Sequence, residues 1–194
     1  EVILSNAMGG GGNPARLAAL AAGLPEPVAG LSIDRQCVGG LDAILLARAL
    51  VESGAARIVV AGGAESYSRR PLRLATDPEG GPAVPYDRPA FSPFPDRDPD
   101  LHEAAWHLAQ KLGLTRARMD AWAMESHAKA LAGRAPLMAE TVPLLGVTAD
   151  AFSRALTPAL ATRAPALVGD ITGANAAVAA DGAAFVIVSD RPLG

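Results

Sequence analysis

The residue best placed to do chemistry is Cys37, the only cysteine among the 194 residues. It lies between a predicted strand, residues 28–35, and an apolar predicted helix, residues 41–53. Backbone N–H groups are unpaired at a helix N-terminus and the helix dipole favours negative charge there, so a thiolate would be stabilised. Gly39 and Gly40 have no side chains and would let a substrate approach closely. This pattern predicts an exposed cysteine nucleophile at a strand–helix turn.

The position of Cys37 alone leaves two other interpretations open. A lone cysteine in a chain rich in alanine and leucine is often a small buried hydrophobic residue. A redox or regulatory thiol is the third interpretation, and it depends only on the thiolate being stabilised. Because there is one cysteine, an intrachain disulfide is excluded, and a reducing compartment is the better fit.

Other residues of chemically active types give no comparable pattern. The four glycines at positions 9–12 lack the Lys-Ser/Thr pair that a phosphate-binding loop needs. His102 and His107 are five positions apart, so they do not share a helix face as a chelating pair would. No metal site is therefore predicted. His127 is expected to be a surface residue on a helix.

The elements that must position Cys37 alternate between strands and helices. Strands are predicted at residues 2–4, 28–35, 57–63 and 182–189, and helices at residues 15–22 and 41–53. Asn13 and Pro14 form a typical helix start, as N-cap and first helical residue. The helix over 41–53 is apolar nearly all round, which predicts a buried helix. This order of elements favours an α/β layered fold.

The composition changes after Ser68. Residues 69–100 are rich in Pro, Gly, Arg and Asp and are predicted to be irregular. Helices are predicted at 101–112, at 115–132 and, as a short piece, at 148–156. The sequence therefore predicts an α/β core formed by residues 1–68 and 171–194, and an inserted, mostly helical loop region formed by residues 69–170.

The composition also excludes several classes of function. The formal net charge is −3, and no basic stripe appears, so a nucleic-acid partner is not expected. No apolar run is long enough to span a bilayer, and no signal peptide is recognised. A cytoplasmic protein is therefore expected. Since half of the residues are hydrophobic, a sizeable core is expected as well.

Five sequence blocks, in order, resemble motifs of the thiolase family. They are residues 12–25, which begin GNPAR; 33–43, IDRQCVGGLDA; 62–69, GGAESYSR; 119–130, which contain Ser126 and His127; and 175–184, with NA at its start and DGAA at its end. The resemblance covers nearly the whole chain and implies a thiolase-like layered α/β domain. Its central mixed sheet would hold a buried helix and be interrupted by a mostly helical loop region, and the second thiolase domain would be absent.

The resemblance also implies an activity. In thiolases a cysteine, here Cys37, takes an acyl group from acyl-CoA or cleaves a 3-ketoacyl-CoA, and CoA or a carbanion accepts the acyl group in turn. Coenzyme A is then a substrate, and no permanently bound cofactor is implied. The alternative is a thiolase-like binding or assembly subunit that keeps the fold without the chemistry.

This chain departs from the family at positions that resemble its CoA contacts. Leu101 and Ala177 are the candidate contacts, although neither matches the family residue, and Val178 replaces a glycine. Arg69, Arg70 and Arg73 could meet CoA phosphates, but a solvated loop face with a structural Arg69 is the preferred interpretation.

The resemblance implies partners as well. The substrate would be an acyl-CoA or an acyl-carrier protein. The family's activating histidine, second cysteine and Asn–Glu motif belong to its second domain, so a C-terminal thiolase half from elsewhere is expected. Thiolases dimerise through the strand before the nucleophile, here about residues 31–35, so a homo-oligomer or hetero-oligomer is expected.

Overall fold

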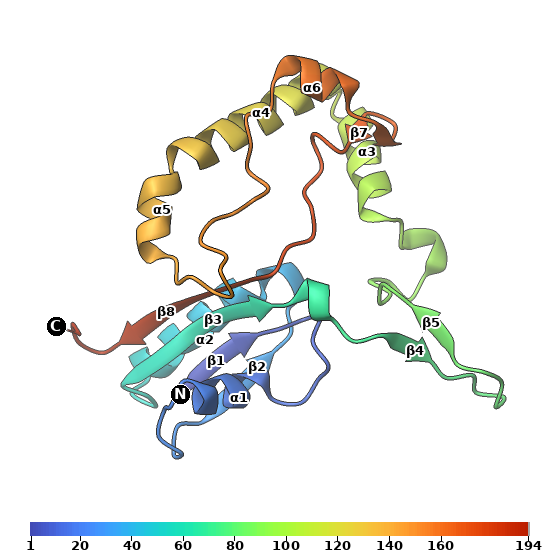
Figure 1. Cartoon of the computed structure of the whole chain (residues 1–194). Coiled ribbons are helices and arrows are strands. Elements are labelled where there is room, and N and C mark those ends of the chain that lie inside the picture. The colour runs from blue at the N-terminus through green and yellow to red at the C-terminus, as the bar shows by residue number, and fades with distance from the viewer. Residues whose placement is uncertain (194) are drawn as a thin grey trace. The chain divides into compact units, whose positions relative to one another are not determined.

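The computed structural model describes residues 1–193 and divides them into two compact units. The core unit is formed by Glu1–Arg88 and the segment from Ala179 onward, and the insertion unit by Pro89–Val178. Each is described by itself below, with its elements labelled in Figure 1. The domain limits inferred from the sequence, 1–68 with 171–194 and 69–170, stay a prediction.

A four-stranded mixed sheet forms the middle of the core unit. Its strands are β1 (Val2–Ser5), β2 (Gly30–Ile33), β3 (Ile58–Glu65) and β8 (Gly182–Ser189), in the order β2-β1-β3-β8. β1 runs parallel to both of its neighbours, whereas β8 runs antiparallel to β3. The predicted mixed α/β sheet is confirmed. The carboxyl ends of β1, β2 and β3 therefore share one edge with the start of β8.

Helix α1 (Pro14–Ala21) covers one face of this sheet. The side chain of Asn13 caps it by accepting a hydrogen bond from the backbone N–H of Arg16, at 3.0 Å, as the sequence predicts. The same Asn13 oxygen accepts a hydrogen bond from the Ser32 hydroxyl at 2.7 Å. A Cβ on Gly30 would lie 2.5 Å from the Arg16 backbone nitrogen, so the glycine permits close helix–strand packing.

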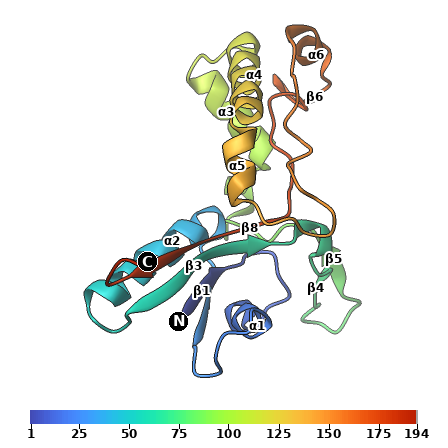
Figure 2. The same cartoon turned by 60° about the vertical axis from the view of Figure 1, so that its left-hand side comes forward.

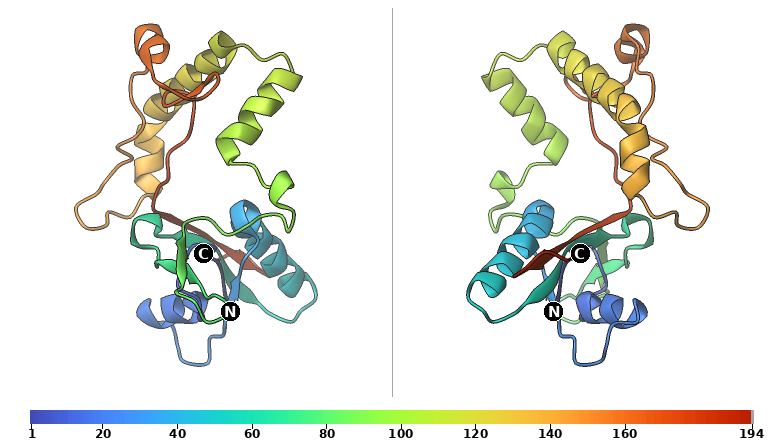
Figure 3. Two further views of the ribbon diagram at one scale, coloured as in Figure 1. Left: turned by 90° about the vertical axis from the view of Figure 1, so that its right-hand side faces the viewer. Right: turned by 90° about the vertical axis from the view of Figure 1, so that its left-hand side faces the viewer.

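Helix α2 (Gly39–Glu52) covers the opposite face, as Figure 3 shows. Successive residues of a strand point to opposite faces. Ile3 therefore packs with Ala43 and Ala47 of α2, whereas Val2 and Leu4 pack toward α1. The sheet is thus covered on both faces by one helix each.

The prediction that the helix after Cys37 is buried all round is wrong for this chain. Only the small residues of α2 that face the sheet are buried, at Gly39, Ala43 and Ala47. Leu41 and Leu45 are 58% and 51% exposed. A helix that rests on a single sheet can bury only one side, so the leucine side stays uncovered.

The segment after β3 is more regular than its composition suggests. A short 3₁₀ helix, Tyr67–Arg69, leads into a hairpin of β4 (Arg73–Ala75) and β5 (Val84–Tyr86). A second 3₁₀ turn follows at Pro95–Arg97. The antiparallel pairs here join residues as far apart as Arg73 and Tyr86, which the Pro- and Gly-rich composition does not reveal.

Besides the 3₁₀ turn at Pro95–Arg97, the insertion unit has four α-helices and one two-stranded hairpin within the described residues, and Figure 2 gives a second view of it. They are α3 (Leu101–Lys111), α4 (Arg116–Ala132), α5 (Arg134–Glu140) and α6 (Pro158–Arg163), with β6 (Ala166–Val168) and β7 (Ile171–Thr172). The two long predicted helices are confirmed, and the Thr115 side chain caps the second by accepting a hydrogen bond from the Arg118 N–H. Leu156, Ala161 and Ala174 form the centre of its core.

The predicted helical piece at residues 148–156 is wrong, and the sequence missed α5 and α6. The Asp150 carboxylate accepts hydrogen bonds from the backbone N–H groups of Phe152 and Ser153, at 2.8 and 3.0 Å. An aspartate that binds the backbone in this way stabilises a turn in competition with a helix. The Ser153 hydroxyl and these N–H groups also hold the pKa of Asp150 below its usual range.

Of the helices in the described residues, none combines the length and the apolar character that crossing a bilayer requires.

Candidate active site

Cys37 lies at the carboxyl edge of the sheet, in a single 3₁₀ turn that joins β2 to α2. The turn spans Gln36–Val38, and α2 begins immediately after it at Gly39. The thiol is free and exposed. The structure therefore places the cysteine at the start of a 14-residue helix, at the kind of turn that presents a side chain outward.

The residue before Cys37 adopts a strained backbone conformation. Gln36 has a φ of 47°, in the left-handed region that non-glycine residues rarely occupy. The Asp34 carboxylate holds this conformation by accepting a hydrogen bond from the Gln36 backbone N–H at 2.8 Å. Strain of this kind costs about 1–3 kcal/mol and is typical of functional turns.

Gly39 and Gly40 serve two different purposes. A Cβ on Gly39 would overlap the Ser5 hydroxyl and lie 2.8 Å from the Ser5 Cβ, so this glycine lets α2 approach the end of β1. A Cβ on Gly40 would meet nothing within 4 Å. The space beside the second glycine is therefore open, as a site that admits a substrate requires.

The end of β3 holds the loop that follows β1. The Glu65 carboxylate accepts hydrogen bonds from the backbone N–H groups of Ala7 and Met8, the latter at 3.2 Å. The Asn6 amide donates to the carbonyl of Ala64 at 2.8 Å. No pattern in the sequence alone assigns this role to Glu65. Its position at the end of a buried strand, in the GGAES block, was the available signal.

Asp181 and Ser68 join the same edge of the sheet from the side of β8. Asp181 immediately precedes β8 and accepts hydrogen bonds from the Ser68 hydroxyl and, at 2.8 Å, from the Ser68 backbone N–H. These two donors hold the pKa of Asp181 below its usual range. The start of β8 is thereby tied to the segment that leaves β3.

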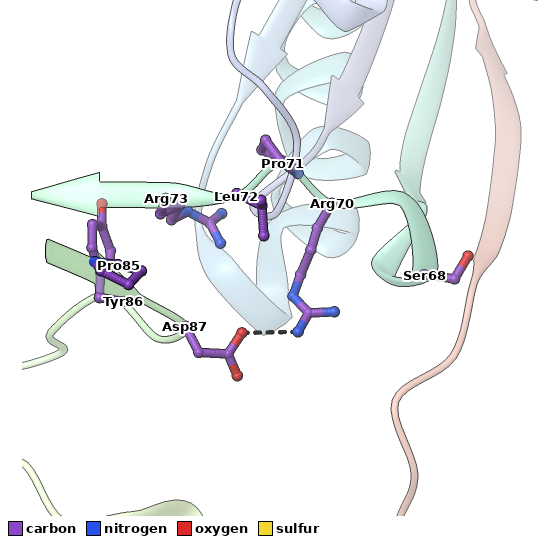
Figure 4. A pocket seen from close by; sticks show the side chains of 8 residues that line it. All are labelled: Ser68, Arg70, Pro71, Leu72, Arg73, Pro85, Tyr86 and Asp87. Carbon is purple, nitrogen blue, oxygen red and sulfur yellow. Dashed lines mark hydrogen bonds and ion pairs between the residues drawn. The ribbon is translucent and has the colours of Figure 1, made fainter. Parts of the chain in front are cut away.

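Arg70 and Arg73 of the basic cluster are among the residues that line an open hollow of about 500 Å³ in the core unit. Figure 4 shows Arg70 directed toward Asp87, with 2.8 Å between Nη2 and Oδ1. The Arg70 guanidinium also lies over the Tyr67 ring, 4.1 Å from its centroid. Arg70, rather than the exposed Arg69, therefore has the structural role that the sequence suggested for Arg69.

The two candidate CoA contacts lie in the insertion unit, whereas Cys37 lies in the core unit. Leu101 is the first residue of α3 and is 61% exposed. Ala177 is exposed in the segment after β7. Their role in binding coenzyme A stays a prediction.

The prediction that His127 is a surface residue is wrong. Its side chain is buried within the insertion unit, and its Nδ1 accepts a hydrogen bond from the backbone N–H of Arg154 at 3.4 Å. The Phe152 ring lies 5.2 Å from the imidazole, centroid to centroid. His127 thus anchors the loop after α5, which the pattern of α4 alone could not reveal.

No group of three or more His, Cys, Asp or Glu side chains that could hold a metal ion occurs in residues 1–193.

Comparison with known proteins identifies a family for nearly the whole chain. The sequence model of the family described as "Thiolase, N-terminal domain" matches residues 1–191. The Bacillus subtilis protein named "Putative acetyl-CoA C-acetyltransferase YhfS" is 38% identical over 98% of this chain and 51% of its own length. The Staphylococcus epidermidis protein VraB, with the same description, is 41% identical over 66% of this chain and 34% of its own length.

A solved structure agrees with these sequence relatives. The crystal structure of the Bacillus anthracis acetyl-CoA acetyltransferase superposes with a TM-score of 0.80 and 29% sequence identity. The match covers 97% of this chain and 53% of that protein. The chain thus spans about half the length of its full-length matches.

Proposed function

The chain belongs to the thiolase family, and on this premise we propose that Cys37 accepts an acyl group from acyl-CoA as a thioester. In Claisen condensation the acyl group then passes to the carbanion of a second acyl-CoA. In 3-ketoacyl-CoA cleavage the thiolate attacks the 3-keto carbon, the C2–C3 bond breaks, an acyl-CoA leaves as an enolate that takes up a proton at C2, and CoA then takes the acyl group from Cys37. The observation that supports this proposal most strongly is the strained turn that presents an exposed Cys37 thiol at the start of α2.

In the condensation direction, the first step exchanges one thioester for another. The Cys37 thiolate attacks the carbonyl carbon of the acyl-CoA, and a bond forms between that carbon and Sγ. The bond from the same carbon to the CoA sulfur breaks, and CoA leaves as a thiolate that takes up a proton. The backbone N–H of Cys37 would stabilise the oxyanion that forms in between. Covalent catalysis of this kind divides one difficult reaction into two easier ones.

The second step returns the cysteine to its starting state. The incoming nucleophile attacks the thioester carbonyl carbon, and the bond to Sγ breaks with Cys37 leaving as a thiolate. The proton acceptor and donor for the complete cycle would come from a C-terminal thiolase half. That expectation is consistent with a chain that covers 51% of its Bacillus subtilis relative.

The test is an intact mass spectrum after incubation with acetyl-CoA and acid quenching. It compares the chain with its Cys37→Ala variant, each alone and with a C-terminal thiolase half added. We expect a gain of one acetyl group that Cys37→Ala abolishes, with circular dichroism unchanged. Acetylation that persists in Cys37→Ala would contradict the assignment. If neither preparation gains the acetyl group, a non-catalytic thiolase-like binding or assembly subunit is the better description.

A further inference from the structure

An ion pair joins the two sides of the turn that contains Cys37. Arg35 precedes the turn and Asp42 lies in the first turn of α2, with 3.0 Å between Arg35 Nε and Asp42 Oδ2. Residues 36–41, which include the cysteine, lie between the two partners in the sequence. The pair therefore links the strand side of the turn directly to the helix.

The backbone between Arg35 and Asp42 includes a strained residue and a single short turn. Gln36 is one of two non-glycine residues with a positive φ in residues 1–193, the other being Leu145. The 3₁₀ turn itself depends on a hydrogen bond from the Val38 N–H to the carbonyl of Arg35, at 3.3 Å. Arg35 thus supports the turn with its carbonyl and with its side chain.

We propose that Arg35 and Asp42 are positioning residues for Cys37, and that their ion pair holds the turn in the conformation that presents the nucleophile. This inference rests on the proposed function. Neither side chain needs to touch the substrate, because each acts through the backbone of the turn. Asp34 supports the same turn from the strand side through its bond to Gln36 N–H.

The pair also balances charge near the thiol. The opposite charges of Arg35 and Asp42 cancel when the two side chains are paired. Removing one side chain leaves the charge of the other unpaired within five sequence positions of Cys37. Three other acidic groups lie at this edge of the sheet, and each accepts a hydrogen bond from a backbone N–H: Asp34, Glu65 and Asp181. An unpaired carboxylate disfavours a nearby thiolate, and an unpaired guanidinium favours it. The two single variants should therefore act on the thiolate in opposite directions.

The experiment uses the purified chain and measures two quantities. One is the pH dependence of Cys37 alkylation by iodoacetamide, and the other is hydrogen exchange at the Val38 amide. The variants are Arg35→Gln, Asp42→Asn and the charge-exchanged pair Arg35→Asp with Asp42→Arg. Glu52→Gln is the matched control, because Arg48 and Glu52 form an exposed ion pair on the same helix, 2.8 Å apart.

We expect the Val38 amide to exchange about threefold faster in both single variants, since an exposed pair contributes modestly. The alkylation midpoint should rise in Arg35→Gln and fall in Asp42→Asn. The charge-exchanged pair should restore both quantities, and Glu52→Gln should change neither. Unchanged Val38 exchange, or midpoints that move in the same direction, would overturn the positioning role.

Alkylation needs only an accessible thiolate and no acyl transfer. A chain that shows these responses and never gains an acetyl group would therefore keep the positioning role and lose the proposed function. A chain that is acetylated and shows none of them would keep the function and lose the positioning role.

Discussion

The Ser5 side chain occupies the space that a side chain on Gly39 would need. Ser5 is the last residue of β1, and Gly39 is the first residue of α2, two positions after Cys37. The helix that follows the proposed nucleophile can therefore reach the end of the central strand only with a glycine at this position. This contact ties the Cys37 turn to the middle of the sheet.

Gly39→Ala should consequently destabilise the chain. The φ of Gly39 is −58°, which alanine adopts freely, so the effect would come from the overlap with Ser5 alone. Overpacking of this kind costs about 1–3 kcal/mol, measurable by urea denaturation. Ser5→Gly in the same chain should recover much of the loss.

Gly40→Ala is the matched control for this prediction, because a Cβ there meets nothing within 4 Å. It should be neutral or should stabilise the chain by up to about 1 kcal/mol, as alanine favours a helix. Equal losses in the Gly39 and Gly40 variants would contradict the proposed contact.

Gln36→Gly should keep or raise the stability of the chain. The left-handed conformation costs a non-glycine residue about 1–3 kcal/mol, and glycine avoids that cost while adding some freedom to the unfolded chain. Gln36→Val should lower the stability, because a branched side chain fits a φ of 47° poorly. Urea denaturation of both variants tests this. A stable valine variant beside an unstable glycine variant would refute the strained turn.

Ser68→Ala should lower the stability of the fold at neutral pH. In acid the variant and the unchanged chain should be equally stable. The Ser68 hydroxyl and N–H lower the pKa of Asp181 in the folded state, whereas an unfolded aspartate has a pKa of about 3.9. Stabilisation from a depressed pKa is therefore present above pH ~4 and is lost as the pH falls through the folded-state value. Melting temperatures of the chain and the variant should differ at pH 7 and converge as the pH falls through the folded-state pKa of Asp181. A difference that grows toward low pH would show the opposite linkage.

Asp120→Ala should destabilise the insertion unit. Asp120 is 7% exposed, and its two oxygens bind Arg116 Nε at 2.7 Å and Asn175 Nδ2 at 2.9 Å. Breaking a buried pair leaves a cation without its partner and costs about 3 kcal/mol. Hydrogen exchange of the α4 amides would detect the loss within this unit.

Glu125→Ala provides the comparison on the same helix. Its pair with Lys129 is exposed, so the exchange of the α4 amides should change little. If the Asp120 and Glu125 variants behave alike, the buried network does not support α4.

The local features of this chain could be predicted from neighbouring residues. The α1 start follows from Asn13 and Pro14, because a cap and its helix lie within three positions of each other. The long helices of the insertion unit and the strands of the core follow from the spacing of their apolar residues. The strand–helix turn around Cys37 was predictable for the same reason, and five sequence blocks indicated the family.

Distant contacts were decided by the tertiary structure alone. Glu65 reaches Ala7 across 58 positions, and Ser68 reaches Asp181 across 113. Such partners depend on strand order and register, which no local pattern specifies. The burial of His127 and the exposure of the α2 leucines depend in the same way on which elements pack together. The sequence by itself determined the family, the main elements and the candidate nucleophile, because these depend on short-range patterns. Only the tertiary structure decided which side chains support the Cys37 turn, because that support comes from residues brought together by packing.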